Sequence, residues 1–261
     1  MGYRNLMRLS SCFLILAVLL SGCSLLPGKI DKTKSWSAQK LYTEAKSELS
    51  DGNYQTAIDY FEKLEARYPF GPYSQQAQLE IAYAYYKYDE PESAIAAAER
   101  FVKTNPRHPN VAYAYYLEGL INYDRGHSLI DRFLTRDLSE RDPEYARKAF
   151  YDFQKVVKNY PNSRYADDAR QRMIHLRNIM AKYEINVADF YMRRGAYLAA
   201  ANRAEYVLKN YEHTTSVPPA LVIAVKAYRK LKLTKLAGDA QRVLELNFPK
   251  EAATVGNAKA D

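Results

Sequence analysis

The sequence predicts an all-α fold, a superhelical solenoid (α-α superhelix) of five stacked helix pairs with about ten helices. The first observation behind this prediction is an alanine that recurs at Ala57, Ala94, Ala149, Ala200 and Ala237. Each is followed, at the same distance, by residues that end a helix: Tyr68-Pro69, Asn105-Pro106, Tyr160-Pro161, Tyr211-Glu212 and Phe248-Pro249. Small alanines let two helices approach closely, and proline cannot continue a helix.

Glycines supply the second observation. Gly52, Gly126 and Gly195 each stand at the end of a helical pattern, where glycine accepts positive φ at little cost. The third observation is the stretch between Asn162 and Arg194, which lacks proline and glycine and has apolar residues spaced three or four apart. It predicts one helix of about 30 residues with a single apolar stripe. The stripe consists of Ala166, Ala169, Met173, Leu176, Met180, Tyr183, Val187 and Phe190.

Residues 1–22 have the pattern of an export signal, with Arg4 and Arg8 ahead of a short apolar run and small residues at the end. The run is too short to cross a bilayer, which takes about 20 apolar residues. The ending Leu20-Ser21-Gly22-Cys23 resembles the lipobox of bacterial lipoproteins. This resemblance implies cleavage before Cys23 and lipidation of that cysteine, and Ser24 after it implies the outer membrane.

The remaining chain divides into three parts. Residues 23–36, with Pro27, Gly28 and several charges, are expected to be the lipidated cysteine and a flexible tether. Residues 37–249 form the repeat domain, and residues 250–261 show no apolar periodicity and are expected to be a disordered tail. The mature chain would keep no free thiol, so the repeat domain must be held by packing alone.

The repeat itself has about 34 residues, with Gly-x-Tyr-x-x-Ala in its turn and proline at its end, and resembles the tetratricopeptide repeat. Asp89 and Pro91 depart from this pattern in the second repeat. In the third, Gly126 and Ala149 lie much farther apart than elsewhere, which indicates an insertion at about 127–144. A long loop within a repeat is often functional, although drift in length explains it nearly as well.

Composition and motifs give no sign of catalysis. There is no nucleophile elbow, phosphate loop, metalloprotease motif or paired cysteine set, and the four histidines are far apart in sequence. The net charge of +8 is mild, and without a run of Lys and Arg it does not indicate nucleic-acid binding. We therefore expect no catalytic residue, metal or cofactor.

One face of the predicted array has the residues of a binding surface. Tetratricopeptide arrays present the first helix of each pair on their concave side. By that register the concave side includes Tyr42, Lys46, Tyr83, Tyr86, Lys87, Tyr113 and Tyr116. Tyrosine offers a large apolar area with few rotors, and lysine attracts a carboxylate. The surface suits a peptide with aromatic side chains and a free C-terminus, although about half of the tyrosines are expected to pack between helices instead.

Two further segments, Arg67-Tyr68-Pro69-Phe70-Gly71-Pro72-Tyr73 and Tyr160-Pro161-Asn162-Ser163, resemble the BamD family, lipoprotein subunits of the outer-membrane β-barrel assembly (BAM) machine. The resemblance implies a lipid-anchored chain at the periplasmic face of the outer membrane. It implies N-terminal repeats that receive the aromatic C-terminal signal of unfolded outer-membrane proteins, with Tyr68, Phe70 and Tyr73 added to the groove. It also implies C-terminal repeats that dock on the POTRA domains of BamA, where Arg203 pairs with an acid, with other BAM lipoproteins as further partners.

Several alternatives remain open from the residues. The leading hypothesis is a non-catalytic assembly factor. The second is a peptidoglycan-binding or division-coordinating repeat lipoprotein, and the third is an enzyme whose site lies in the insertion. For Arg203 the alternative is a solvated helix charge, and for Tyr68, Phe70 and Tyr73 it is packing between repeats.

Overall fold

The computed structural model describes residues 31–125, 139 and 142–256, and across these residues it contains eleven α-helices and no strand. Ten of them form five consecutive pairs: α2 (Ala38–Ser50) with α3 (Tyr54–Arg67), α4 (Pro72–Lys87) with α5 (Pro91–Thr104), α6 (Val111–Arg125) with α7 (Glu144–Asn159), α8 (Ala166–Arg193) with α9 (Tyr197–Asn210), and α10 (Val217–Lys230) with α11 (Thr234–Asn247). The eleventh, α12 (Pro249–Gly256), follows the last pair. The predicted all-α solenoid of five pairs is confirmed.

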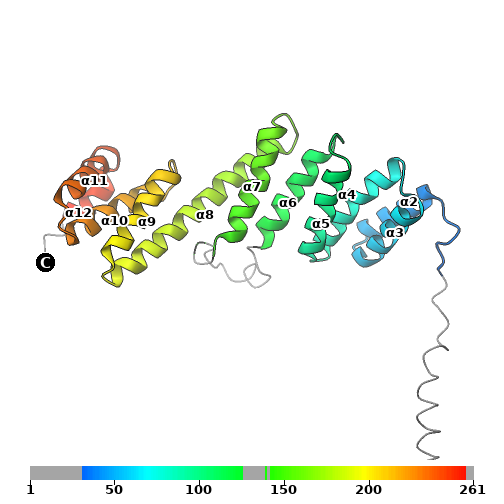
Figure 1. Ribbon diagram of the computed structural model, residues 1–261, viewed down its shortest axis with the longest axis horizontal. Coiled ribbons are helices and arrows are strands. Elements are labelled where there is room, and N and C mark those ends of the chain that lie inside the picture. Colours follow the sequence, from blue (N-terminus) through cyan, green and yellow to red (C-terminus); the bar gives the residue numbers. More distant parts are fainter. Residues whose placement is uncertain (1–30, 126–138, 140–141, 257–261) are drawn as a thin grey trace, which may run out of the picture.

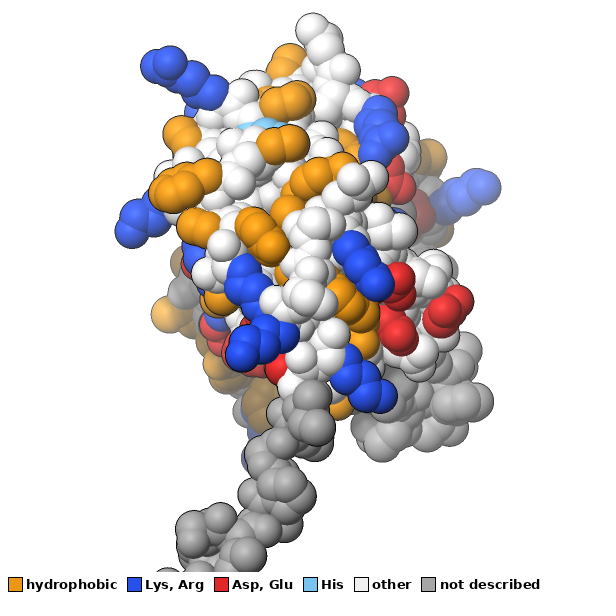
Figure 2. Space-filling model, turned by 90° about the vertical axis from the view of Figure 1, so that its right-hand side faces the viewer, with side chains coloured by type: hydrophobic (Ala, Val, Ile, Leu, Met, Phe, Trp, Pro, Cys, Tyr) orange, Lys and Arg blue, Asp and Glu red, His pale blue; other side chains and the backbone are white. Residues whose placement is uncertain are grey.

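The pairs stack in chain order into a rod, with α2 and α3 at one end and α11 and α12 at the other (Figure 1). Each helix packs mainly on the helices before and after it, so the hydrophobic core runs along the rod as a series of clusters. Figure 2 looks onto the α2 end, where hydrophobic side chains lie interspersed with Lys and Arg.

The recurring alanines explain the pairing. All five are buried, because each lies early in the second helix of a pair, where it faces the first. The predicted helix stops are confirmed as well: the residues that cap the second helices are Tyr68, Asn105, Tyr160, Tyr211 and Phe248.

Among the turns within pairs that the structure describes, two contain the predicted glycines and two contain another residue at the same place. Gly126 lies outside the described residues. Gly52 and Gly195 have φ of 82° and 73°, while Asp89 and Lys232 adopt the same left-handed conformation in the corresponding turns, at 64° and 59°. Aspartate visits this region more readily than most residues, and proline suits the first turn of a helix. The departures at Asp89 and Pro91 therefore leave the α4–α5 pair intact.

The long helix is α8, a single helix of 28 residues, as predicted. Its stripe is only partly as expected: Ala166, Leu176 and Met180 are buried, but Phe190 near the C-terminal end is exposed. Beyond Met180 the buried positions move to Ala181, Ile185 and Ala188. The reason is that α8 packs on α7 as well as on α9 and α10, so different faces are covered along its length.

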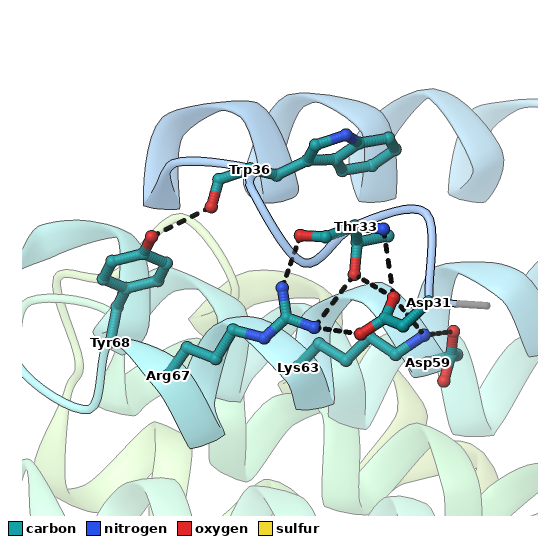
Figure 3. Close-up of polar contacts among 7 residues, drawn as sticks. All are labelled: Asp31, Thr33, Trp36, Asp59, Lys63, Arg67 and Tyr68. Atoms are coloured by element: carbon teal, nitrogen blue, oxygen red, sulfur yellow. Dashed lines mark hydrogen bonds and ion pairs between the residues drawn. The ribbon is translucent and has the colours of Figure 1, made fainter.

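The end of the predicted tether is not a flexible segment. Thr33 is buried, and Arg67 on α3 donates hydrogen bonds to the Thr33 carbonyl and hydroxyl and to the Asp31 carboxylate (Figure 3). Lys63 lies 3.6 Å from the same carboxylate. We call Asp31, Thr33, Lys63 and Arg67 the N-terminal clasp. It fixes residues 31–36 on the repeat domain because two cations of α3 face an acid in the incoming chain.

The clasp is reinforced by hydrogen bonds and aromatic packing. The side chain and backbone of Thr33 donate to Asp31 and, with Lys63 and Arg67, lower the pKa of this aspartate to about 2. The Trp36 ring meets Tyr60 edge-on with centroids 5.4 Å apart, and Tyr68 Oη donates to the Trp36 carbonyl at 2.9 Å.

The expected disordered tail at 250–261 is wrong for residues 250–256, which belong to α12. Val255 is buried with Leu221, Val225 and Leu244, and Arg229 Nη1 donates to the Val255 carbonyl at 3.2 Å. Phe248, Ala252 and Val255 are spaced to share one helix face, but the run is too short to stand out as a period in the sequence. Residues 257–261 lie outside the described part.

Other predictions fall on segments that the structure does not describe. The expected signal at 1–22 and the lipidation site Cys23 are among them, as is most of the insertion at about 127–144. Ser139, within the insertion, is described and buried, and its hydroxyl accepts a hydrogen bond from Asn186 Nδ2 of α8 at 3.0 Å. Within the described ranges, no helix combines the length and the hydropathy needed to cross a bilayer.

Candidate functional site

A hollow of about 350 Å³ opens among α2, α4, α6 and the turn that precedes α8. We call it the tyrosine hollow. Its lining brings together three residues predicted for the groove, Lys46, Tyr83 and Tyr113, each from the first helix of a different pair. The remaining lining residues are Gln76, Leu79, Glu80, Asn110, Arg164 and Tyr165.

Aromatic rings form one wall of the tyrosine hollow. The Tyr165 ring lies 5.4 Å from that of Tyr113 and stacks at 5.0 Å on that of Tyr116. Tyr83 lies 6.3 Å from Tyr86. Burial raises the pKa of Tyr113 and of Tyr86, so both phenols keep their protons and act as donors at neutral pH. The wall can cover an apolar or aromatic side chain and still offer hydroxyl groups.

The cations of the tyrosine hollow differ in their state of pairing. Lys46 Nζ lies 2.8 Å from Glu80 Oε1, in a partly exposed pair of the kind that contributes about 0–1 kcal/mol. Arg164 forms no ion pair with any described carboxylate. Its Nη2 donates to Tyr165 Oη at 2.6 Å, and its guanidinium lies 4.9 Å from the centre of that ring. Arg164 is therefore the cation best placed to receive an anionic group.

Arg164 and Tyr165 were not among the residues predicted from the sequence. They follow Pro161 in the turn between α7 and α8, whereas the repeat register directs attention to first helices only. Tyr165 stacks on Tyr116 of α6, and Tyr116 donates a hydrogen bond to Asp168 of α8, so the turn lies against α6 at the tyrosine hollow. The sequence feature that could have indicated them is an arginine next to a tyrosine shortly after the predicted helix stop at Pro161.

Several other predicted tyrosines have internal partners. Tyr42 packs on Tyr73 at 5.5 Å and on Phe61 at 5.9 Å between ring centres. Tyr86 Oη donates to the Asp124 carboxylate, and Tyr116 Oη donates to Asp168 at 2.6 Å. The contact of Tyr42 with Phe61 lies within the first helix pair and the other three join successive pairs, as the alternative interpretation expected for about half of the tyrosines.

The other predicted residues lie outside the lining of the tyrosine hollow. Phe70, in the turn between the first two pairs, is 92% exposed, and Lys87 at the end of α4 is also exposed. Tyr68 is partly exposed, but its hydroxyl is bound to the segment held by the N-terminal clasp. Phe70 is thus the large aromatic side chain of this region with most of its surface in solvent.

The proposed partner contact, Arg203, lies on α9 and is paired within the chain. Its Nη1 is 2.9 Å from Glu184 Oε2 on α8, and the two side chains are 44% and 8% exposed. Arg203 is therefore an exposed helix residue whose charge is already paired within the chain, and its pairing with an acid of another protein stays a prediction.

Comparison with known proteins gives consistent matches. Residues 34–244 match the family described as YfiO, an outer membrane lipoprotein. The outer membrane protein assembly factor BamD of Neisseria meningitidis serogroup B is 45% identical over 239 residues, which cover 90% of this chain and 89% of the relative. BamD of Vibrio cholerae is 40% identical, covering 88% and 94%, and BamD of Haemophilus influenzae is 35% identical, covering 94% and 93%.

Proposed function

The chain belongs to the YfiO family of outer membrane lipoproteins, and from this premise we propose that it is a non-catalytic assembly factor for outer-membrane β-barrel proteins. In this proposal Cys23 carries the lipid and holds the chain at the periplasmic face of the outer membrane. The N-terminal repeats bind the C-terminal signals of unfolded outer-membrane proteins. The C-terminal repeats dock on the POTRA domains of BamA, and other BAM lipoproteins complete the complex. No cofactor or nucleic acid takes part.

The observation that carries the first task is the combination of Arg164 with the rings of Tyr83, Tyr113 and Tyr165 in one hollow. A peptide that ends in an aromatic residue presents a ring and a carboxylate only a few ångströms apart. The ring would lie against the tyrosine wall, and the carboxylate would accept hydrogen bonds from Arg164. Lys46 can turn from Glu80 towards the same carboxylate, because a partly exposed ion pair is weak.

The strength of the hydrogen bonds to the peptide carboxylate determines how much affinity its removal should cost. A hydrogen bond to a charged group contributes about 1.5–3 kcal/mol, or roughly tenfold to a hundredfold in affinity. Blocking the terminal carboxylate should therefore weaken binding of the peptide more than changing any one residue upstream of it.

The test uses the full lipidated chain in detergent micelles and a fluorescent decapeptide of alternating polar and aromatic residues that ends in phenylalanine. Anisotropy measures the dissociation constant for the free-acid peptide and for its C-terminal amide. We expect amidation to weaken binding at least tenfold. The variant Arg164→Gln should weaken the acid peptide by a similar factor and remove the difference between the two peptides.

A matched control is Arg107→Gln, which removes an exposed arginine that does not line the tyrosine hollow. It should bind like the unaltered chain. Equal affinity for acid and amide, or equal loss in both arginine variants, would contradict the proposed site.

The second task is supported by the position of Arg203 on α9, in the C-terminal half of the rod. Because Glu184 already neutralises Arg203, a partner acid would have to share the guanidinium with it. Arginine has five donors, so it can serve two carboxylates at once. The variants that separate docking from folding are given in the Discussion.

A further inference from the structure

We propose that a second hollow, formed by α5, α6 and α7, binds the guanidinium of an arginine side chain from a partner protein. This acidic hollow has a volume of about 490 Å³, and its lining includes Glu99, Glu118, Asn122 and Asp152. It shares no lining residue with the tyrosine hollow. The inference is independent of the proposed peptide site and of Arg203.

Two buried acceptors without hydrogen-bond donors point to a ligand. Glu118 and Asn122 are 3% and 5% exposed, and both line the acidic hollow. Glu118 Oε1 and Asn122 Oδ1 have no hydrogen-bond partner. The two residues lie one turn apart on α6, so their side chains share a face of the helix. A buried polar atom is normally hydrogen-bonded, because losing water without compensation is costly.

The donors around these acceptors are already engaged. Asn122 Nδ2 donates to Asp152 Oδ2 at 2.8 Å. Lys155 Nζ lies 2.9 Å from Asp152 Oδ1 and 3.5 Å from Glu118 Oε2, so it serves Asp152 and the second oxygen of Glu118 and not Glu118 Oε1.

The other two cations at the acidic hollow are also paired: Arg125 with Glu92, and Lys148 with Glu144 at 2.8 Å. Glu99 makes no ion pair with any described residue, although it lies close enough to Glu118 to raise its pKa. The charge that remains uncompensated is therefore negative, from Glu99 and, above about pH 7, also from Glu118, in a chain whose formal net charge is +8.

The chemistry of the acceptors selects the ligand. The described part of the chain contains no group of three or more acidic, histidine or cysteine side chains that could hold a metal ion. Two acceptor oxygens without donors suit a cation that carries several N–H groups. A guanidinium is planar and carries five N–H donors, which suits a carboxylate oxygen and an amide oxygen side by side. It is also more weakly hydrated than an ammonium group, so it enters a partly buried site more readily. Ile95 and Ala96 in the lining offer apolar surface for the methylene stem.

The test follows the Ile95 methyl signal by NMR in the full lipidated chain in micelles. The probe is the tripeptide acetyl-Gly-Arg-Gly-amide, and its matched control carries citrulline, which has nearly the same shape as arginine but no charge. We expect the Ile95 signal to shift saturably with the arginine peptide and the affinity for the citrulline peptide to be at least tenfold lower. Glu118→Gln, which keeps the size of the side chain, should lower the affinity for the arginine peptide about tenfold.

Glu44→Gln on α2 makes the same change of charge outside both hollows and should leave binding unaltered. Equal titrations by the two peptides on the unaltered chain would overturn the proposal, and this comparison decides the matter even if Glu118→Gln does not fold. Equal effects of the two glutamine variants would overturn it as well, because they would show that the overall charge and not the acidic hollow attracts the peptide.

Discussion

Arg203 of α9 donates from Nη1 to Oε2 of Glu184 on α8 at 2.9 Å, so the arginine proposed to contact BamA also joins two helices of its own chain. Glu184 is 8% exposed, and Arg203 is its ion-pair partner. Removing the arginine therefore leaves a buried carboxylate without compensation, whether or not another protein is present.

The first prediction concerns stability. Arg203→Glu should lower the free energy of unfolding by about 1–3 kcal/mol, because it places a second carboxylate beside the buried one. Arg203→Lys keeps the charge and should lose less. Thermal melting followed by circular dichroism measures both. Equal melting temperatures for Arg203→Glu and the unaltered chain would show that the pair contributes nothing to the fold.

Docking requires a variant that removes the charge and keeps the fold. In the double variant Glu184→Gln with Arg203→Gln neither charge is left without its partner, so it should melt close to the unaltered chain. We expect it to retain less BamA than the single variant Glu184→Gln in crosslinked pulldowns from outer membranes. Equal retention by the two would argue against a direct contact of Arg203 with BamA.

A second prediction concerns the contact between α6 and α7. A Cβ atom added at Gly119 would lie 2.6 Å from Cε1 of Phe153, which is fully buried. Gly119→Ala should therefore destabilise the chain by about 1–3 kcal/mol, although alanine favours helices. Gly238→Ala on α11, where nothing lies within 4 Å, should stabilise it by about 0.5–1 kcal/mol. Urea titration of both variants measures the difference, and a change of the same sign in both would refute this account of Gly119.

The third prediction is a pH dependence from Glu118. Burial raises the pKa of Glu118 from 4.5 to about 7, against the attraction of Lys155 on α7 and with repulsion from Asp152 and Glu99. Between these values the folded carboxyl group holds a proton that the unfolded chain releases. The contribution of Glu118 to stability is therefore full below pH 4.5 and is lost as the pH rises through about 7.

Glu118→Gln cannot titrate, so its stability relative to the unaltered chain should increase between about pH 5 and pH 8, by a few kcal/mol at most. Chemical denaturation at the two pH values measures the change. A difference that is constant across this range would mean that Glu118 is ionised in the folded chain.

A fourth prediction tests the N-terminal clasp. Arg67→Ala removes the donor that holds Thr33 and Asp31, so trypsin should cut after Lys32 and Lys34 several times faster than in the unaltered chain. Arg100→Ala is the matched control, because it breaks a partly exposed pair with Glu65 elsewhere on the solenoid. Limited proteolysis with mass spectrometry measures both. Unchanged cleavage after Lys32 in Arg67→Ala would show that the segment is held by other contacts.

The fold could be predicted from the sequence because its determinants are local. Ala57 and Tyr68 lie in one helix and its cap, and the same spacing recurs in every pair, so a single chain displays the pattern five times. The burial pattern in the second half of the long helix was harder to predict from the sequence. The buried face of α8 shifts between Leu176 and Ala188 because its neighbouring helices change along its length.

The candidate sites depend on contacts between segments far apart in sequence. Arg67 and Asp31 are separated by 36 residues, and Tyr116 and Asp168 by 52. Arg164 reaches the tyrosine hollow from a turn, and Glu118 looks in the sequence like an ordinary polar position of an amphipathic helix. Only the stacking of successive pairs shows which polar groups are enclosed, and periodicity along one helix carries no such information.

The N-terminal clasp also limits the distance between the lipidation site proposed at Cys23 and the repeat domain. Asp31 lies eight residues after Cys23, and a fully extended chain spans at most about 3.6 Å per residue, so these two residues are no more than about 29 Å apart. With the lipid on Cys23, as proposed, Asp31 at the α2 end of the rod stays within about 29 Å of the bilayer surface. The distance of the α12 end from the bilayer is not limited in this way. On that proposal the clasp keeps the α2 end of the rod near the membrane and leaves the angle of the rod to be set by whatever holds its far end.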